Sequence, residues 1–155
     1  MNDKKQTILE LFKPIILLNY SKNFINFLKL IGIFIFFFGL YLAVFKAPTD
    51  YQQLEFYRII FIHVPSAWIS LLLYFLLSFC SGLFLINRHP ILILLAKIIS
   101  YLGILFTIVT LFSGMFWGKP TWGTFWVFDA RLTSVFILLL LFISFLLLLV
   151  VYKES

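Results

Sequence analysis

Apolar residues occur in four long runs along the chain, separated by short polar stretches. The runs cover about residues 24–45, 67–86, 91–116 and 132–152. A helix needs about 20 mostly apolar residues to cross the hydrocarbon core of a bilayer. Each run is long enough, and isolated strands would leave backbone groups unpaired in lipid. The pattern therefore predicts an all-α, polytopic membrane protein with four transmembrane helices, forming a single membrane domain over residues 1–155.

Composition agrees with a membrane protein. The chain is 63% hydrophobic and 12% charged, against roughly 45–50% and 25% in soluble domains. A net charge of +6 would suggest a nucleic-acid partner in a soluble protein. Here the basic residues flank apolar runs, and no nucleic-acid-binding motif is present, so we expect lipid as the partner and no nucleic acid.

The basic residues divide unevenly between the two sides of the predicted membrane. The side that carries both termini receives eight of them, which are Lys4, Lys5, Lys13, Lys22, Lys29, Arg88, Lys97 and Lys153. The other side receives four, which are Lys46, Arg58, Lys119 and Arg131. Because positive residues accumulate on the cytoplasmic side, or the matrix side in a mitochondrion, we expect both termini inside. Two loops, residues 46–66 and 117–131, then face outward.

Tryptophan is concentrated in the second outward loop, within the stretch WGKPTWGTFWVFDARLTS (Trp117–Ser134). Trp117, Trp122 and Trp126 lie there, and Trp68 lies at the outer end of the second predicted helix. An aromatic belt would place tryptophans at both membrane interfaces. All four are expected on the outer side, which favours a binding surface over a belt.

Two histidines are candidate metal ligands. Pro65 suits the first turn of a helix, so His63 is expected just ahead of the positive helix end, where the neutral ring is favoured. His89 lies in the inner turn, about 30 Å away along the second helix at 1.5 Å per residue. The two cannot share a metal. A packing role remains the alternative for His63, and His89 is expected to be a solvated turn residue.

Flat aromatic surfaces, one histidine and nearby cations together suit haem b, bound transiently. His63 would be the axial ligand of the iron, and the aromatic side chains would stack on the ring. The propionates would meet a cation, with arginine favoured for its fork geometry. The candidate cations are Arg131, Arg58, Lys119 and Lys46. Asp129 either contacts the ligand directly or has a structural role, in which it pairs with Arg131 or caps the last helix.

The Trp-rich stretch resembles the "WWD" signature of haem-handling proteins, most closely that of the haem exporter protein C family, also called cytochrome c maturation protein C. The family pattern is close to WG-x-P-x-WGTFW-V-W-D-ARLTS, and HVPSAW, starting at His63, resembles the family's first outer-loop histidine motif. The resemblance covers roughly residue 40 to the end. It implies haem binding at the outer face of a bacterial cytoplasmic or mitochondrial inner membrane, and delivery during c-type cytochrome biogenesis. The implied partners are a membrane-anchored haem chaperone and other maturation subunits, with an ATP-binding-cassette transporter among the candidates.

The chain departs from the family pattern in two places. Phe128 stands where the family usually has tryptophan, so an aromatic ring is retained and an indole N–H is lost. The family typically has six helices, and its second histidine ligand follows the fourth, whereas this sequence stops at Ser155. A truncated or split gene product, a fragment and an impaired function all remain open.

Two other functions compete with haem delivery. A b-type cytochrome would require paired histidines on facing helices, which the apolar runs lack. A small permease or structural subunit would use its tryptophans only as anchors, and would show no Soret band even after haem addition. No nucleophile–base pair or phosphate-binding loop is evident, so we do not expect an enzyme.

Overall fold

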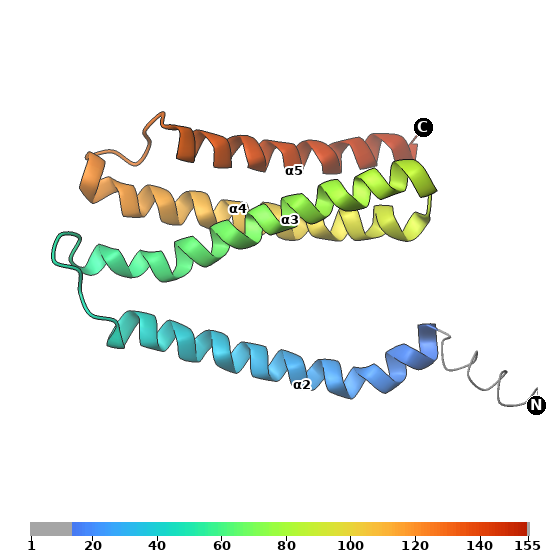
Figure 1. Cartoon of the computed structure of the whole chain (residues 1–155), viewed down its shortest axis with the longest axis horizontal. Coiled ribbons are helices and arrows are strands. Elements are labelled where there is room, and N and C mark those ends of the chain that lie inside the picture. The colour runs from blue at the N-terminus through green and yellow to red at the C-terminus, as the bar shows by residue number, and fades with distance from the viewer. Residues whose placement is uncertain (1–13, 155) are drawn as a thin grey trace, which may run out of the picture. The chain divides into compact units, whose positions relative to one another are not determined.

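The computed structural model describes residues 14–154, and the side chains of residues 21–151. The regular elements in this range are all helical, which confirms the predicted fold class (Figure 1). Four segments are long and apolar enough to cross a membrane, namely Ser21–Lys46, Glu55–Asn87, Pro90–Trp122 and Ala130–Val151. The orientation of the termini and the single domain stay predictions. Three of the counted charges, Lys4, Lys5 and Lys13, lie outside the described residues.

The described part of the first compact unit, which ends at Ala47, is one long helix. Helix α2 (Pro14–Tyr41) runs into a wide π-helical turn, η1 (Leu42–Lys46). Of the described side chains in this unit, Ala43 alone is buried, and the phenylalanines and isoleucines between residues 21 and 41 are exposed. A helix that is apolar on all sides and exposed in this way is suited to contact with lipid.

The second unit, Pro48–Ser155, contains the other helices. A short 3₁₀-helix, η2 (Glu55–Ile59), leads into α3 (Ile60–Asn87). Helices α4 (Pro90–Trp122) and α5 (Ala130–Glu154) follow. Helix α4 packs against both α3 and α5 (Figure 1). The α3–α4 turn is tight, and the His89 ring accepts the backbone N–H of Ile91 at 3.3 Å, which caps α4.

Small residues line the face of α4 that packs on its neighbours. They recur every three or four positions, which places them on one side of the helix: Ala96, Ser100, Gly103, Thr107, Thr110, Gly114 and Gly118. The buried hydroxyls of Ser100 and Thr107 donate to α4's own carbonyls, so they need no partner on another helix. Small side chains of this kind allow helices to approach closely in a membrane.

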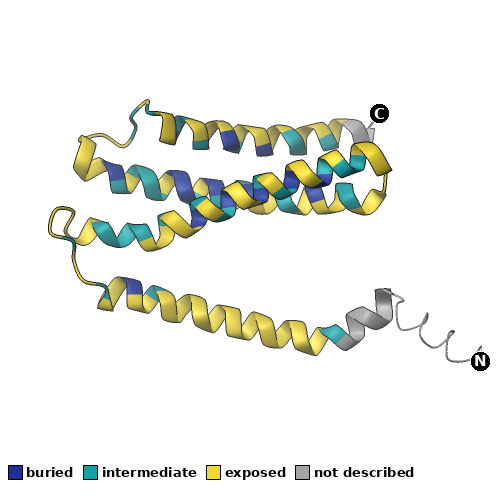
Figure 2. Ribbon diagram, viewed as in Figure 1, coloured by how far each residue is buried: buried dark blue, intermediate teal, exposed yellow. Residues whose placement is uncertain are grey.

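The core lies where this face meets α3 and α5 (Figure 2). The Phe142 ring of α5 occupies the space above Gly103, where a Cβ would overlap it. The same ring meets Tyr74 of α3 edge to face, with centroids 5.8 Å apart. Phe142 is fully buried, so the three helices are joined through one aromatic side chain.

Two helices continue beyond the apolar runs, which corrects two local predictions. Helix α4 extends to Trp122, so Trp117 and Trp122 are helical and the irregular outer segment is residues 123–129. It ends at Gly123, whose φ of 71° is left-handed and whose N–H donates to Lys119 O at 2.9 Å. His63 is the fourth residue of α3, so its predicted place ahead of the helix is wrong. The predicted bounds followed the apolar runs, but a helix also includes polar residues for as long as its backbone hydrogen bonds continue.

Candidate functional site

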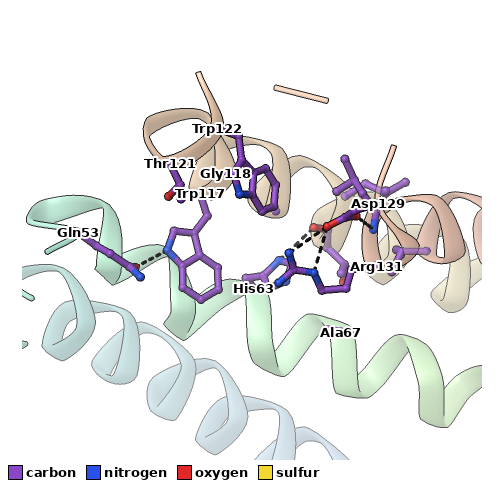
Figure 3. Close-up of a pocket in the computed structure, with 14 residues that line it drawn as sticks. Gln53, His63, Ala67, Trp117, Gly118, Thr121, Trp122, Asp129 and Arg131 are labelled. Atoms are coloured by element: carbon purple, nitrogen blue, oxygen red, sulfur yellow. Dashed lines mark hydrogen bonds and ion pairs between the residues drawn. The ribbon is translucent and has the colours of Figure 1, made fainter. Parts of the chain in front are cut away.

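A cavity of about 440 Å³ lies where α3, α4 and the start of α5 meet (Figure 3). Its lining comes from these three helices and from the segments that precede α3 and α5. The lining residues are Gln53, His63, Ala67, Thr110, Leu111, Gly114, Trp117, Gly118, Thr121, Trp122, Asp129, Arg131, Leu132 and Val135. The structure thus brings together five residues singled out in the sequence, namely His63, Trp117, Trp122, Asp129 and Arg131.

His63 is held by α4 at one of its two ring nitrogens. Its Nδ1 lies 3.1 Å from the backbone carbonyl oxygen of Thr110 and 3.0 Å from Ser113 Oγ. The ring can approach α4 because Gly114 has no side chain: a Cβ there would lie 3.0 Å from His63 Cε1. The imidazole also meets the Trp117 ring at an interplanar angle of 65°, with centroids 5.6 Å apart.

Trp117 is in turn held by a residue that precedes α3. The side chain of Asp50 accepts the backbone N–H groups of Gln52 and Gln53, at 2.9 and 2.8 Å, and so shapes the turn that places Gln53. Gln53 Oε1 then accepts the indole N–H of Trp117 at 2.7 Å (Figure 3). The tryptophan is therefore fixed at its polar edge by Gln53 and at its ring by His63.

Asp129 caps helix α5 and pairs with Arg131. Its Oδ1 accepts the backbone N–H of Leu132 at 2.8 Å, and its Oδ2 lies 3.0 Å from Arg131 Nη2. The Leu132 N–H, and secondarily Arg131, hold the pKa of Asp129 below its usual range. The Arg131 guanidinium also lies over the Trp122 ring, 5.4 Å from its centroid, and Trp122 rests on Gly118. Both structural roles predicted for Asp129 are present, while direct ligand contact stays a prediction.

Three predicted aromatic residues do not line the cavity. Trp68 is 71% exposed on α3. Trp126 follows the left-handed Gly123, so it leaves the helical face that carries Trp122, and it packs against Phe128 and Phe136 with centroids 5.9 and 5.8 Å away. Phe128 is 90% exposed. A role for these three in ligand binding stays a prediction.

Two predicted cations also lie outside the cavity lining. Arg58 forms an ion pair with Glu55 at 2.8 Å within η2. Lys119 donates to Gly123 O at 2.6 Å and lies over the Phe125 ring, which stabilises the end of α4. Of the candidate cations in the second unit, which are Arg58, Lys119 and Arg131, Arg131 is the one that lines the cavity.

Some residues that position the cavity side chains could not be recognised by the aromatic and histidine motifs. Thr110, Ser113 and Gly114 hold His63, yet in the sequence they lie within an apolar run. The signal for Thr110 and Gly114 is the repetition of small residues every three or four positions along α4, whereas Ser113 is outside that repetition. Gln53 carries no such signal, because its contact with Trp117 joins residues 64 positions apart.

Residues 7–155 match the model of the family described as "Heme exporter protein C". The chain belongs to this family. A cytochrome c biosynthesis ccmC-like mitochondrial protein of Marchantia polymorpha is 53% identical over 106 residues, which cover 68% of this chain and 46% of that protein. "Heme exporter protein C" of Bradyrhizobium diazoefficiens is 38% identical over 138 residues, covering 89% and 52%. The protein of the same name from Escherichia coli K12 is 42% identical over 98 residues, covering 63% and 40%.

The chain spans about half the length of the curated relatives it matches. The family match confirms the resemblance found in the Trp-rich stretch. Together with the four apolar helices, it identifies the chain as an integral membrane protein with bacterial and mitochondrial relatives.

Proposed function

We propose that the cavity between α3, α4 and α5 binds haem b as cargo, with His63 as an axial ligand of the iron. The observation that carries this proposal is one imidazole in a cavity walled by Trp117 and Trp122 and bordered by Arg131. A porphyrin brings four equatorial nitrogens, so the protein has to add only axial ligands. Among the described residues, no group of three or more His, Cys, Asp or Glu side chains is placed to hold a bare metal ion. The donor set therefore suits a metal that arrives inside a porphyrin.

The other cavity residues have matching roles in this proposal. Trp117 and Trp122 offer aromatic surface for apolar contact with the porphyrin. Arg131 has an 80% exposed side chain beside the cavity, so its guanidinium can pair with a propionate at little desolvation cost. Gln53 adds an amide at the same rim.

We further propose that the haem is held at the outer membrane face and passed to a membrane-anchored haem chaperone during c-type cytochrome assembly. The family membership and the eight-to-four division of basic residues support this placement. Other maturation subunits, including any ATP-binding-cassette transporter, would be separate chains. Holding and passing haem requires no covalent step, so the role is not enzymatic.

The test is haem titration of the purified chain and of its two histidine variants, followed by absorption spectroscopy. The wild type is expected to give a Soret band with a high-spin, five-coordinate spectrum. His63→Ala is expected to lose most bound haem, with affinity reduced at least about tenfold, or about 1.4 kcal/mol. His89→Ala is the matched control and should bind as the wild type does, because His89 follows the far end of α3 from His63 and does not line the cavity.

Three results would contradict the proposal. Equal haem loss in both histidine variants would remove the assignment of His63. A wild-type chain without a Soret band would favour a permease or structural subunit. A low-spin, bis-histidine spectrum that persists on dilution would favour a b-type cytochrome.

A further inference from the structure

His63 has one nitrogen engaged by α4 and one that is not. Both groups near Nδ1 belong to one turn of α4: the Thr110 carbonyl at 3.1 Å and the Ser113 hydroxyl at 3.0 Å. Among the described residues, Nε2 has no hydrogen-bonding partner. The two nitrogens therefore have different surroundings, and those surroundings decide which of them carries the proton.

The partners of Nδ1 can only accept. A carbonyl oxygen has no hydrogen to donate. Ser113 has one hydroxyl hydrogen, and the nearest acceptor to its Oγ is the Val109 carbonyl at 2.6 Å, closer than His63 Nδ1 at 3.0 Å or the Thr110 carbonyl at 3.1 Å. A hydroxyl that donates to the Val109 carbonyl leaves an oxygen lone pair for His63. Nδ1 must then be the donor, and the lone pair of the neutral ring is on Nε2.

Packing fixes the plane of the ring as well as its proton. Gly114 lets the imidazole lie against α4, and Trp117 contacts it at an interplanar angle of 65°. The ring has little freedom to flip, because a flip would take Nδ1 away from both acceptors. In metal sites, a hydrogen bond from the second ring nitrogen fixes the tautomer and raises the basicity of the ligand nitrogen.

We propose that Ser113 and the Thr110 carbonyl are positioning groups that hold His63 as the Nδ1–H tautomer, so that Nε2 is available as the axial donor to a metalloporphyrin. The inference rests on the proposed haem site and deepens it. Ser113 contributes through its side chain, so it can be removed by mutation, whereas the Thr110 carbonyl remains in every variant.

The first measurement needs no haem. Nitrogen-15 NMR of the detergent-solubilised chain with labelled histidine, in a His89→Ala background, reports the tautomer of His63 alone. We expect the proton on Nδ1, whereas a free histidine side chain in water favours the proton on Nε2. A proton on Nε2 would overturn the proposal, even if haem still binds.

The second measurement is haem affinity in Ser113→Ala, with Ser113→Thr as the conservative variant. Loss of such an outer hydrogen bond typically lowers metal affinity 10- to 100-fold. Because the Thr110 carbonyl remains, we expect about a tenfold loss, recovered by Ser113→Thr. Ser100→Ala is the matched control: Ser100 is on the same helix and also donates to the carbonyl four residues earlier, at 2.9 Å, but does not contact His63.

Resonance Raman spectroscopy of the ferrous, five-coordinate complex separates positioning from simple packing. A weaker hydrogen bond at Nδ1 makes Nε2 a poorer donor, so the iron–imidazole stretching band should move to lower frequency in Ser113→Ala. The band should return in Ser113→Thr and stay in place in Ser100→Ala. An unchanged band and unchanged affinity in Ser113→Ala would overturn the role of Ser113. If the wild type binds no haem while NMR shows the Nδ1–H tautomer, the proposed function fails and the positioning of His63 stands.

Discussion

Two parts of the same face of α4 are used in opposite ways. At Gly103, in the middle of the bundle, the Phe142 ring fills the space that the missing side chain leaves, and it is fully buried. At Gly114, which is four positions after Thr110 in the same row of small residues, the His63 ring takes the equivalent place. There the packing does not close, and a cavity of about 440 Å³ remains.

The difference comes from the ring that α4 receives. Thr107 and Ser113 both donate to the carbonyl four residues earlier, each at 2.6 Å. Thr107 donates to the carbonyl of Gly103, and the ring that packs on Gly103 is the apolar ring of the fully buried Phe142. Beside Ser113 the neighbour is an imidazole, whose nitrogen gains acceptors from the same back-bonded turn. The same row of small residues on a helix can therefore pack against an apolar ring in the core or hold a polar ring at a binding site.

Gly103→Ala should have the largest effect on stability. The added Cβ would overlap the Phe142 ring, and overpacking of a dense core costs about 1–3 kcal/mol. Thermal unfolding in detergent measures the loss, and Phe142→Leu in the same chain should recover part of it. The control is Gly82→Ala on α3, where a Cβ would meet nothing within 4 Å. Equal effects at the two glycines would mean that the core is not sealed by Phe142.

The membrane helices could be predicted from the sequence alone, and so could the proximity of His63 to the Trp-rich stretch. Long apolar runs specify helices whatever their neighbours are, and the motif places His63 and Trp117 in one site. The helix ends were misplaced because Trp117–Trp122 is less apolar but still hydrogen-bonded as helix. The contact of His63 with Ser113 depends on how far α3 and α4 are shifted along each other. That shift is set by packing along both helices, so it cannot be read from either residue alone.

A comparison of Trp122→Ala with Trp126→Ala should show whether haem contacts the cavity lining or the outer segment beside it. Trp122 lines the cavity and stacks with Arg131, whereas Trp126 packs on Phe128 and Phe136. Removal of Trp122 should weaken haem binding about tenfold, which corresponds to about 1.4 kcal/mol. The buried area and ring contacts of one aromatic side chain can contribute that much.

Trp126→Ala should change haem affinity less than about twofold, which is under 0.5 kcal/mol. Haem titration of the two single variants is the measurement. A larger loss in Trp126→Ala than in Trp122→Ala would show that the ligand lies against the outer segment, residues 123–129, rather than in the cavity.

The smallest effect is expected from the pH dependence of the cap at Asp129. Its pKa is lowered in the folded chain by the Leu132 N–H and by Arg131. A carboxyl whose pKa falls on folding stabilises the fold above its unfolded pKa, about 3.9, and loses that contribution as the pH drops through the lowered folded value. Water screens the exposed pair with Arg131, so the contribution is small.

Unfolding of the wild type and Asp129→Asn should therefore differ at pH 7 and converge as the pH falls below about 4. Asparagine can still cap α5, so the difference isolates the charge.

Gly103→Ala provides the contrast between the two parts of α4. Its loss of unfolding free energy is steric, so it should be the same at pH 7 and below about pH 4. A Gly103→Ala deficit that shrinks in acid together with that of Asp129→Asn would mean that the core around Phe142 and the cavity end unfold as one acid-sensitive unit. In the opposite case, the Gly103→Ala variant keeps its full stability loss in acid while Asp129→Asn becomes as stable as the wild type. That result would show that the packing around Phe142 does not depend on the Asp129 cap beside the cavity.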